Sequence, residues 1–111
     1  MKVTVVNENT GLEISDVQIA DTFYLRLKGL MFKKSIDFGG LILTQTSSIH
    51  TFFMRMKIDV IFLGKNGVCL KVVENIGINR LAWAMKSLAV IEFPAGTLSG
   101  RVKPGDVITF K

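Results

Sequence analysis

The sequence predicts a mostly β protein, α+β at the margin, folded as a single compact domain over residues 1–111. We expect an antiparallel, barrel-like or half-open sheet of about six to seven short strands with one short helix near residues 21–29. Three observations predict this class. Short segments rich in branched apolar residues dominate the chain, turn clusters containing glycine separate them, and helical spacing occurs in one place.

The first two strands are expected at residues 3–6 and 12–19. Residues 3–6 alternate and are rich in branched side chains, and a turn cluster follows them. The alternation in 12–19 slips by one residue at Ser15 and Asp16. Such a slip moves the apolar side chains to the other face of a strand, so a bulge or a break is expected there.

The predicted helix begins at Asp21, whose carboxylate can cap the amides of the first turn. Phe23, Leu27 and Leu30 lie near one face at helical spacing, and Gly29 suits the left-handed conformation that ends a helix. The segment is short, so we expect packing to hold it rather than intrinsic propensity.

The second half of the chain contains the clearest hairpin. Residues 58–63 and 68–73 are joined through Asn66 and Gly67, which tolerate the positive φ angles of tight turns. Residues 74–83 are expected to be mostly irregular, and 103–106 to form a type II turn. Further strands are expected at residues 41–43, 87–93 and 107–110.

Composition narrows the class of protein. Hydrophobic residues make up 49% and charged residues 21% of the chain, which is typical of a folded domain. Cys69 is the one cysteine and lies in an apolar run, so we expect a buried thiol. We expect a cytoplasmic protein, because there is no signal-peptide pattern and no apolar run near the roughly 18 residues that span a bilayer.

The net charge of +5 permits contact with anionic partners. The basic residues are scattered along the sequence and are not interleaved with aromatic residues in one block. Nucleic-acid binding is therefore not the expected function. The sequence also lacks a phosphate-binding loop, a dinucleotide fingerprint and a nucleophile elbow, so no cofactor is predicted.

Residues 49–63 contain the only histidine, His50, within a run of aromatic and sulfur-containing residues. If 49–56 were extended, His50, Phe52, Met54 and Met56 would share one face. His50 is then either a core residue bonded to a backbone carbonyl or a pocket-lining acid, base or donor. No metal site is predicted, because a single histidine without cysteine partners would need carboxylates to complete the set of ligands.

Two carboxylates are surrounded by apolar residues in the sequence. Asp59 stands between Ile58 and Val60, where it either accepts backbone amides at the start of the hairpin or pairs with Arg55 or His50. Glu92 lies inside an apolar strand, where alternation turns it either outward or inward. An inward Glu92 would be a second carboxylate able to meet Asp59 or His50.

In order and spacing, these residues resemble those of an uncharacterised family, the domain of unknown function 192 (DUF192), also called UPF0127. The resemblance runs from about residue 20 to residue 108. It rests on Arg26 with Gly29-Leu30-Met31, on 49–55, on Ile58-Asp59-Val60 with Phe62-Leu63, on Glu92 with Ala95-Gly96, and on Gly105-Asp106.

The chain departs from this family at Thr46, Lys57 and Gly64, where relatives often carry cysteine, proline and aspartate. Because Thr46 stands where relatives often carry the cysteine, no thiol-based role is expected in this loop. The resemblance implies a compact β-rich domain and supplies no activity. It marks four residues as part of the family pattern: His50, Met54, Asp59 and Glu92.

Our leading hypothesis is a small protein that binds a small ligand, anionic or polar-headed, in an apolar pocket bordered by His50, Arg55 and Asp59. The candidate binding residues are His50, Phe52, Met54, Arg55 and Asp59. One alternative is a small hydrolase-like enzyme that uses His50 with Asp59 or Glu92. A second alternative is a structural or anionic-surface-binding accessory domain.

Overall fold

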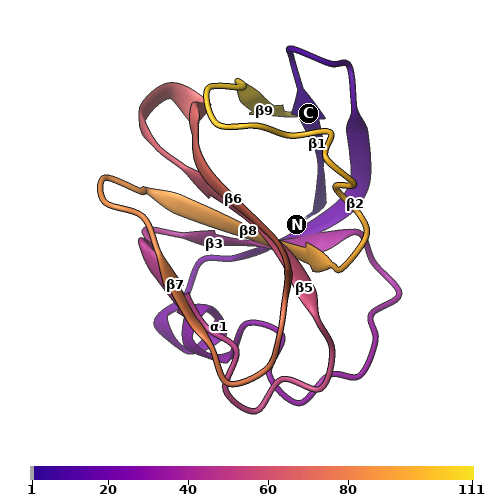
Figure 1. Ribbon diagram of the computed structural model, residues 1–111, viewed down its shortest axis with the longest axis vertical. Coiled ribbons are helices and arrows are strands. Elements are labelled where there is room, and N and C mark those ends of the chain that lie inside the picture. Colours follow the sequence, from indigo (N-terminus) through magenta and orange to yellow (C-terminus); the bar gives the residue numbers. More distant parts are fainter. Residues whose placement is uncertain (1) are drawn as a thin grey trace.

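The computed structural model describes residues 2–111, which form one curved β-sheet with a smaller layer on its outer face (Figure 1). In chain order the elements are β1 (Lys2–Asn7), β2 (Glu13–Ala20), α1 (Phe23–Lys28), β3 (Gly40–Thr44), β4 (Ser48–His50), β5 (Ile58–Leu63), the 3-10 turn η1 (Lys65–Gly67), β6 (Cys69–Ile76), β7 (Leu81–Trp83), β8 (Ala89–Pro94) and β9 (Ile108–Phe110).

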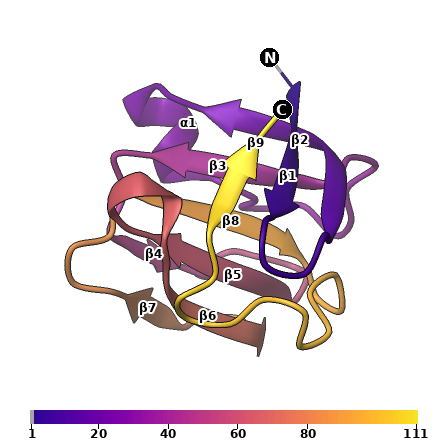
Figure 2. The ribbon, with the colours of Figure 1, turned by 90° about the horizontal axis from the view of Figure 1, so that it is seen from above.

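Seven strands form the large sheet in the order β6-β5-β8-β3-β2-β1-β9. Its two edge strands approach each other at one end, where Val68 and Val107 form an antiparallel bridge. There the Cys69 amide donates to the Asp106 carbonyl and the Gly105 amide donates to the Cys69 carbonyl, both at 2.8 Å. The sheet is therefore a half-barrel joined along one seam, as Figure 2 shows from above. The predicted fold class is confirmed.

One strand pair departs from the antiparallel expectation. β2 and β3 are parallel neighbours, with Val17 opposite Gly40 and Ala20 opposite Leu43. Parallel neighbours need a crossover connection, and here that connection contains α1. This topology places α1 on the outer face of the sheet, which also carries the small antiparallel sheet made of β4 and β7 (Figure 1).

The central strands are buried on both faces, which gives the molecule two apolar cores. Inside the half-barrel, Ile61, Phe93 and Leu98 belong to one core. On the outer face, Val60 and Phe62 pack in a second core that includes residues of β4 and β7. Because strand side chains alternate between faces, neighbouring residues of β5 and β8 serve different cores.

Several local predictions are confirmed. β1 and β2 change register between Val3 and Val5, and Asp16 has a φ of +59°, so the predicted irregularity at Ser15–Asp16 is a bulge. β5 and β6 form the predicted hairpin. Gly105 has a φ of +95° in the turn before β9, where the Asp106 amide donates to the Lys103 carbonyl at 3.0 Å.

Other local predictions are wrong. The helix is capped by Thr22 rather than Asp21, since the Leu25 amide donates to Thr22 Oγ1 at 3.1 Å. Residues 51–57 are not extended but form turns, and the segment 74–83 is more regular than expected because β6 reaches Ile76 and β7 follows.

None of the helices within residues 2–111 has the length and apolar character needed to cross a bilayer.

Candidate functional site

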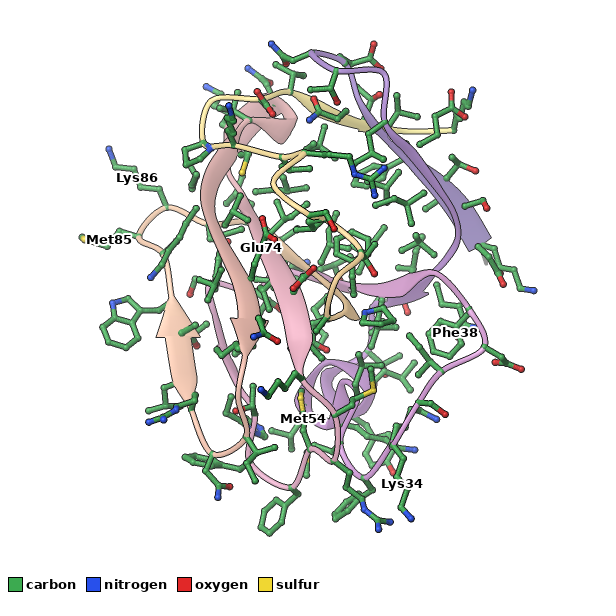
Figure 3. All side chains as sticks on the ribbon, turned by 45° about the vertical axis from the view of Figure 1, so that its right-hand side comes forward. Lys34, Phe38, Met54, Glu74, Met85 and Lys86 are labelled. Carbon is green, nitrogen blue, oxygen red and sulfur yellow. The ribbon has the colours of Figure 1, made fainter. Side chains whose placement is uncertain are left out.

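A cavity of about 370 Å3 lies on the outer face of the sheet, between α1 and the β4–β7 layer. Its wall combines apolar side chains with an acid, an imidazole, two cations and three uncharged polar residues. The cavity is lined by Arg26, Leu27, Lys28, Gly29, Leu43, Gln45, Thr46, Ser48, Ile49, His50, Met54, Leu81 and Glu92. Figure 3 shows Met54 beside α1 in this region.

Glu92 supplies the acid. It lies on β8 opposite Leu41 and Val60, so its side chain shares their face of the sheet. The residue is 1% exposed, and its Oε1 has no hydrogen-bond partner among residues 2–111. Burial raises the pKa of Glu92 from 4.5 to about 8, although a hydrogen bond from the Leu30 backbone works in the opposite direction. The carboxyl group is therefore mostly protonated at neutral pH.

The end of α1 lies directly against this carboxyl group. Gly29 follows the helix with a φ of +49°, and its amide donates to the Leu25 carbonyl at 2.9 Å. A Cβ atom at Gly29 would lie 3.1 Å from Glu92 Oε1. Glycine is required here by its conformation and by the close approach. The same contact excludes side-chain bulk from above the carboxyl group.

His50 supplies the imidazole. It ends β4 and pairs with Leu81 of β7. Its Nδ1 is buried and has no hydrogen-bond partner among the described residues. Its ring stacks on Phe52, with centroids 5.5 Å apart and planes at 24°. Among the described residues, no backbone carbonyl is a partner of Nδ1.

Asp59 lies on the other face of the sheet. It is opposite Phe93 and completely buried. One carboxylate oxygen accepts the Asn75 amide at 2.8 Å, and the other accepts the amides of Gly96 and Leu98, both at 3.1 Å. Asp59 thus fixes the loop after β8, which is the amide-accepting role among the two predicted for it. It does not line the cavity and does not meet His50 or Glu92.

The remaining candidate residues divide between the wall and the surface. Met54 is buried and lines the cavity. Phe52 is 39% exposed and Arg55 is exposed, and neither lines the cavity. The reason is the turn at 51–54, where Phe53 has a φ of +63°. This turn breaks the single face that an extended chain would have given His50, Phe52 and Met54.

Two cations of the cavity were not among the predicted site residues. Arg26 and Lys28 belong to the last turn of α1 and are partly buried. Arg26 Nη1 also donates to the Asp21 carbonyl at 3.0 Å. The family resemblance includes Arg26 and Gly29, and it was the one signal in the sequence that pointed to this part of the helix. Helical spacing alone could not show that this turn covers Glu92.

Cys69 is buried, as predicted, and burial raises the pKa of its thiol to about 11. It belongs to the core inside the half-barrel, away from the cavity on the outer face. Within residues 2–111, no three histidine, cysteine or carboxylate side chains are grouped as metal ligands. The titratable side chains that line the cavity are Glu92, His50, Arg26 and Lys28.

Comparison with known proteins shows which family and which solved structures this chain resembles. The model of the DUF192 family, described as "Uncharacterized ACR, COG1430", matches residues 4–110. The UPF0127 protein PH1112 of Pyrococcus horikoshii is 46% identical over 67 residues, which cover 56% of this chain and 58% of that protein. The UPF0127 protein TK1120 of Thermococcus kodakarensis is 32% identical over 96% of this chain and 72% of its own length.

The chain thus spans less than two thirds of the Pyrococcus horikoshii protein. Two solved structures share the fold. One is a protein of unknown function from Novosphingobium aromaticivorans, with a TM-score of 0.83 and 24% identity over 98% of this chain and 84% of that one. The other, a proposed transcription regulator from Sinorhizobium meliloti, has a TM-score of 0.82 and 19% identity over 98% and 92% of the two chains. With the family model matching nearly its full length, this chain belongs to the DUF192 (UPF0127) family.

Proposed function

We propose that the protein binds a small polar-headed molecule in the cavity between α1 and the β4–β7 layer. Glu92 and His50 contact the head group, and the apolar wall holds the body. One observation carries the proposal: two residues that line the cavity, Glu92 and His50, each have a buried polar atom, Oε1 and Nδ1, that lacks a partner among residues 2–111.

Buried polar atoms without partners are rare in folded proteins, because each costs about 1–3 kcal/mol. A ligand that bonds to them recovers this free energy on binding. The cavity volume of about 370 Å3 falls in the range of roughly 300–1,000 Å3 that is usual for small-molecule sites. Apolar walls with a few convergent polar groups are also typical of such sites.

A thermal-shift screen with a diverse library of small metabolites tests this proposal. A ligand should raise the melting temperature of the wild type, since binding to the folded state alone stabilises it. The shift should be lost in Glu92→Gln and reduced in His50→Ala, both of which should remain folded. Asp37→Asn is a matched control, because Asp37 is exposed and lies outside the cavity. Equal shifts in all four proteins would place the ligand elsewhere.

Asp59→Ala should behave differently from the cavity variants. It leaves three backbone amides without their carboxylate partner, and we expect a loss of about 3 kcal/mol or more in the free energy of unfolding. Urea denaturation measures this loss. If Asp59→Ala kept its stability but lost the ligand, Asp59 would belong to the binding site and our assignment would be wrong.

A second candidate function is a small hydrolase that uses His50 with Glu92. The observation in its favour is that two titratable groups line one cavity, one of them with a pKa of about 8. Carboxyl groups whose pKa is raised toward neutral pH can act as general acids. Asp59 cannot orient His50 from the opposite face. Turnover of the ligand found by the screen, lost in both Glu92→Gln and His50→Ala, would favour this candidate over simple binding.

A further inference from the structure

We propose that the ligand is a small zwitterion of the apolar amino-acid class, whose ammonium group meets Glu92 and His50 while its carboxylate meets Arg26 and Lys28. This inference rests on the proposed function and names the class of molecule that the cavity takes. It follows from the chemistry of the four titratable residues in the cavity wall and from the apolar side chains of the same wall.

The polar groups of the wall have opposite character. Glu92 is 1% exposed and offers an oxygen without a partner, and His50 offers a nitrogen without one. Arg26 and Lys28 enter the same cavity from α1 and are less deeply buried. An anion alone would pair with the two cations but would bring no hydrogen-bond donor to Glu92 Oε1. An amine alone would satisfy Glu92 and leave the cations without a counter-charge.

A molecule that carries both groups satisfies both sides of the cavity at once. Ionic hydrogen bonds of this kind are about twice as strong as neutral ones, and their cost in desolvation is lowest when each charge has its partner. The rest of the wall is mainly apolar, with Leu27, Leu43, Ile49, Met54 and Leu81, and also contains the uncharged polar residues Gln45, Thr46 and Ser48. This surface suits the branched or thioether side chain of leucine or methionine.

The protonation state of Glu92 provides a test, because the direction of proton exchange on binding depends on which ligand group faces the carboxyl group. Arg26 and Lys28 of α1 and His50 of β4 line the cavity with it, and its neighbours in the sheet are Leu41 and Val60, which do not titrate. Free Glu92 holds its proton at neutral pH, since its pKa is about 8. An ammonium group pairs with the carboxylate form, so the carboxyl O–H bond breaks and the proton passes to the buffer. A ligand carboxylate facing Glu92 would instead favour the protonated form that is already present, so almost no proton would be exchanged near pH 7.

Isothermal titration calorimetry of the full chain near pH 7, in two buffers of different ionisation enthalpy, measures this proton. The probes are leucine and methionine, with isocaproate and isopentylamine as leucine analogues that lack the ammonium or the carboxylate group. We expect leucine or methionine to bind with release of nearly one proton. Removal of either charged group should weaken binding about tenfold or more, because an ionic hydrogen bond is lost.

Matched variants assign the two ends of the molecule. Glu92→Gln should abolish the proton release and weaken leucine binding, whereas Asp37→Asn should change neither. Arg26→Gln and Lys28→Gln should weaken leucine but leave isopentylamine unaffected. Lys65→Gln removes an exposed lysine outside the cavity and should match the wild type.

Tight binding of isocaproate, or binding of leucine without proton release, would overturn the zwitterion class while leaving small-molecule binding intact. The same holds if none of these probes binds but another molecule from the library does. If the library also yields no ligand that depends on Glu92, the proposed function itself is wrong. The wild-type measurement gives these answers even if a variant fails to fold.

Discussion

Glu92 shows what one buried carboxyl group does to the protein around it. Its neighbours in the sheet are aliphatic, and Gly29 lies against its oxygen. Burial without an opposite charge disfavours the ionised form, which is why the pKa rises to about 8. Asp59, one strand away, is as deeply buried but accepts three amides. Similar side chains therefore have different surroundings: Asp59 fixes a loop through three amides, and Glu92 keeps an oxygen without a partner among residues 2–111.

Glu92 should make the stability of the protein fall as pH rises. Unfolded glutamate has a pKa of 4.5, whereas Glu92 in the folded protein has a pKa of about 8. Between these values the folded protein holds a proton that the unfolded chain has released, so the free energy of unfolding declines with pH. Its contribution is fully present below about pH 4.5 and is lost as the pH passes 8.

Glu92→Gln should remove this decline, because glutamine does not titrate. The variant should gain a few kcal/mol relative to the wild type as the pH is raised across this window. Urea denaturation at several pH values measures the difference, with Asp37→Asn as the control for loss of an exposed carboxylate. Parallel curves for Glu92→Gln and the wild type would mean that Glu92 ionises normally.

At the scale of elements, the short helix α1 is held in place by its ends. Thr22 caps its first turn, and Gly29 lets the chain turn down onto Glu92. A helix of six residues is not stable in isolation, since nucleation is costly. The turn after β4 is fixed in a similar way: Thr51 is fully buried, donates to the Gly77 carbonyl and accepts the Arg80 amide, both at 2.7 Å. Caps and one buried hydroxyl thus position both walls of the cavity.

Gly29→Ala should destabilise the protein more than an ordinary glycine substitution in a turn. The alanine would have to keep a positive φ, and its methyl group would lie 3.1 Å from Glu92 Oε1. We therefore expect the free energy of unfolding to fall by about 2 kcal/mol or more. Gly11→Ala is the matched control, because Gly11 has a φ of +80° with nothing within 4 Å of a Cβ. Denaturant titration compares the two. Equal losses would show that contact with Glu92 adds nothing.

At the scale of the whole molecule, the seam between β6 and β9 decides whether the sheet is open or joined. Most of the seam is backbone: the bridge between Val68 and Val107 and the hydrogen bonds between Cys69 and the turn at 105–106. Gly67 lies so close to β9 that a Cβ there would be 2.3 Å from the Ile108 carbonyl oxygen. The seam covers the inner core, to which Cys69 and Ile108 both belong.

Gly67→Ala should therefore open the seam, because the carbonyl of Ile108 must move away. We expect a loss of about 3 kcal/mol or more in the free energy of unfolding and faster hydrogen exchange in β9. Gly100→Ala has the same backbone cost without the clash and lies outside the seam, since Gly100 has a φ of +74° and a Cβ there meets nothing within 4 Å. Should both variants exchange alike in β9, close approach at Gly67 is not what holds the seam.

The outcome of the sequence predictions follows from how many faces of a strand are buried. The turns with Asn66-Gly67 and Gly105 and the bulge at Asp16 were predicted correctly, because positive φ and phase slips are local properties. For β5, every residue is buried, so its sequence carries no alternation. The direction of Asp59 and Glu92 could not be derived from such strands. The face was set by the pairing of Val60 with Glu92 and of Asp59 with Phe93.

The sequence by itself determined the fold class and the hairpin, and it selected His50 and Glu92 as candidate site residues. Local conformational preference and the family pattern carry that information. Only the tertiary structure decided that Asp59 lies apart from both, that Arg26 and Lys28 join them, and that the sheet meets at a seam. These contacts join residues that are far apart in the chain. Strand register and crossover topology decide which of these residues share a face, and no short segment of sequence encodes either one.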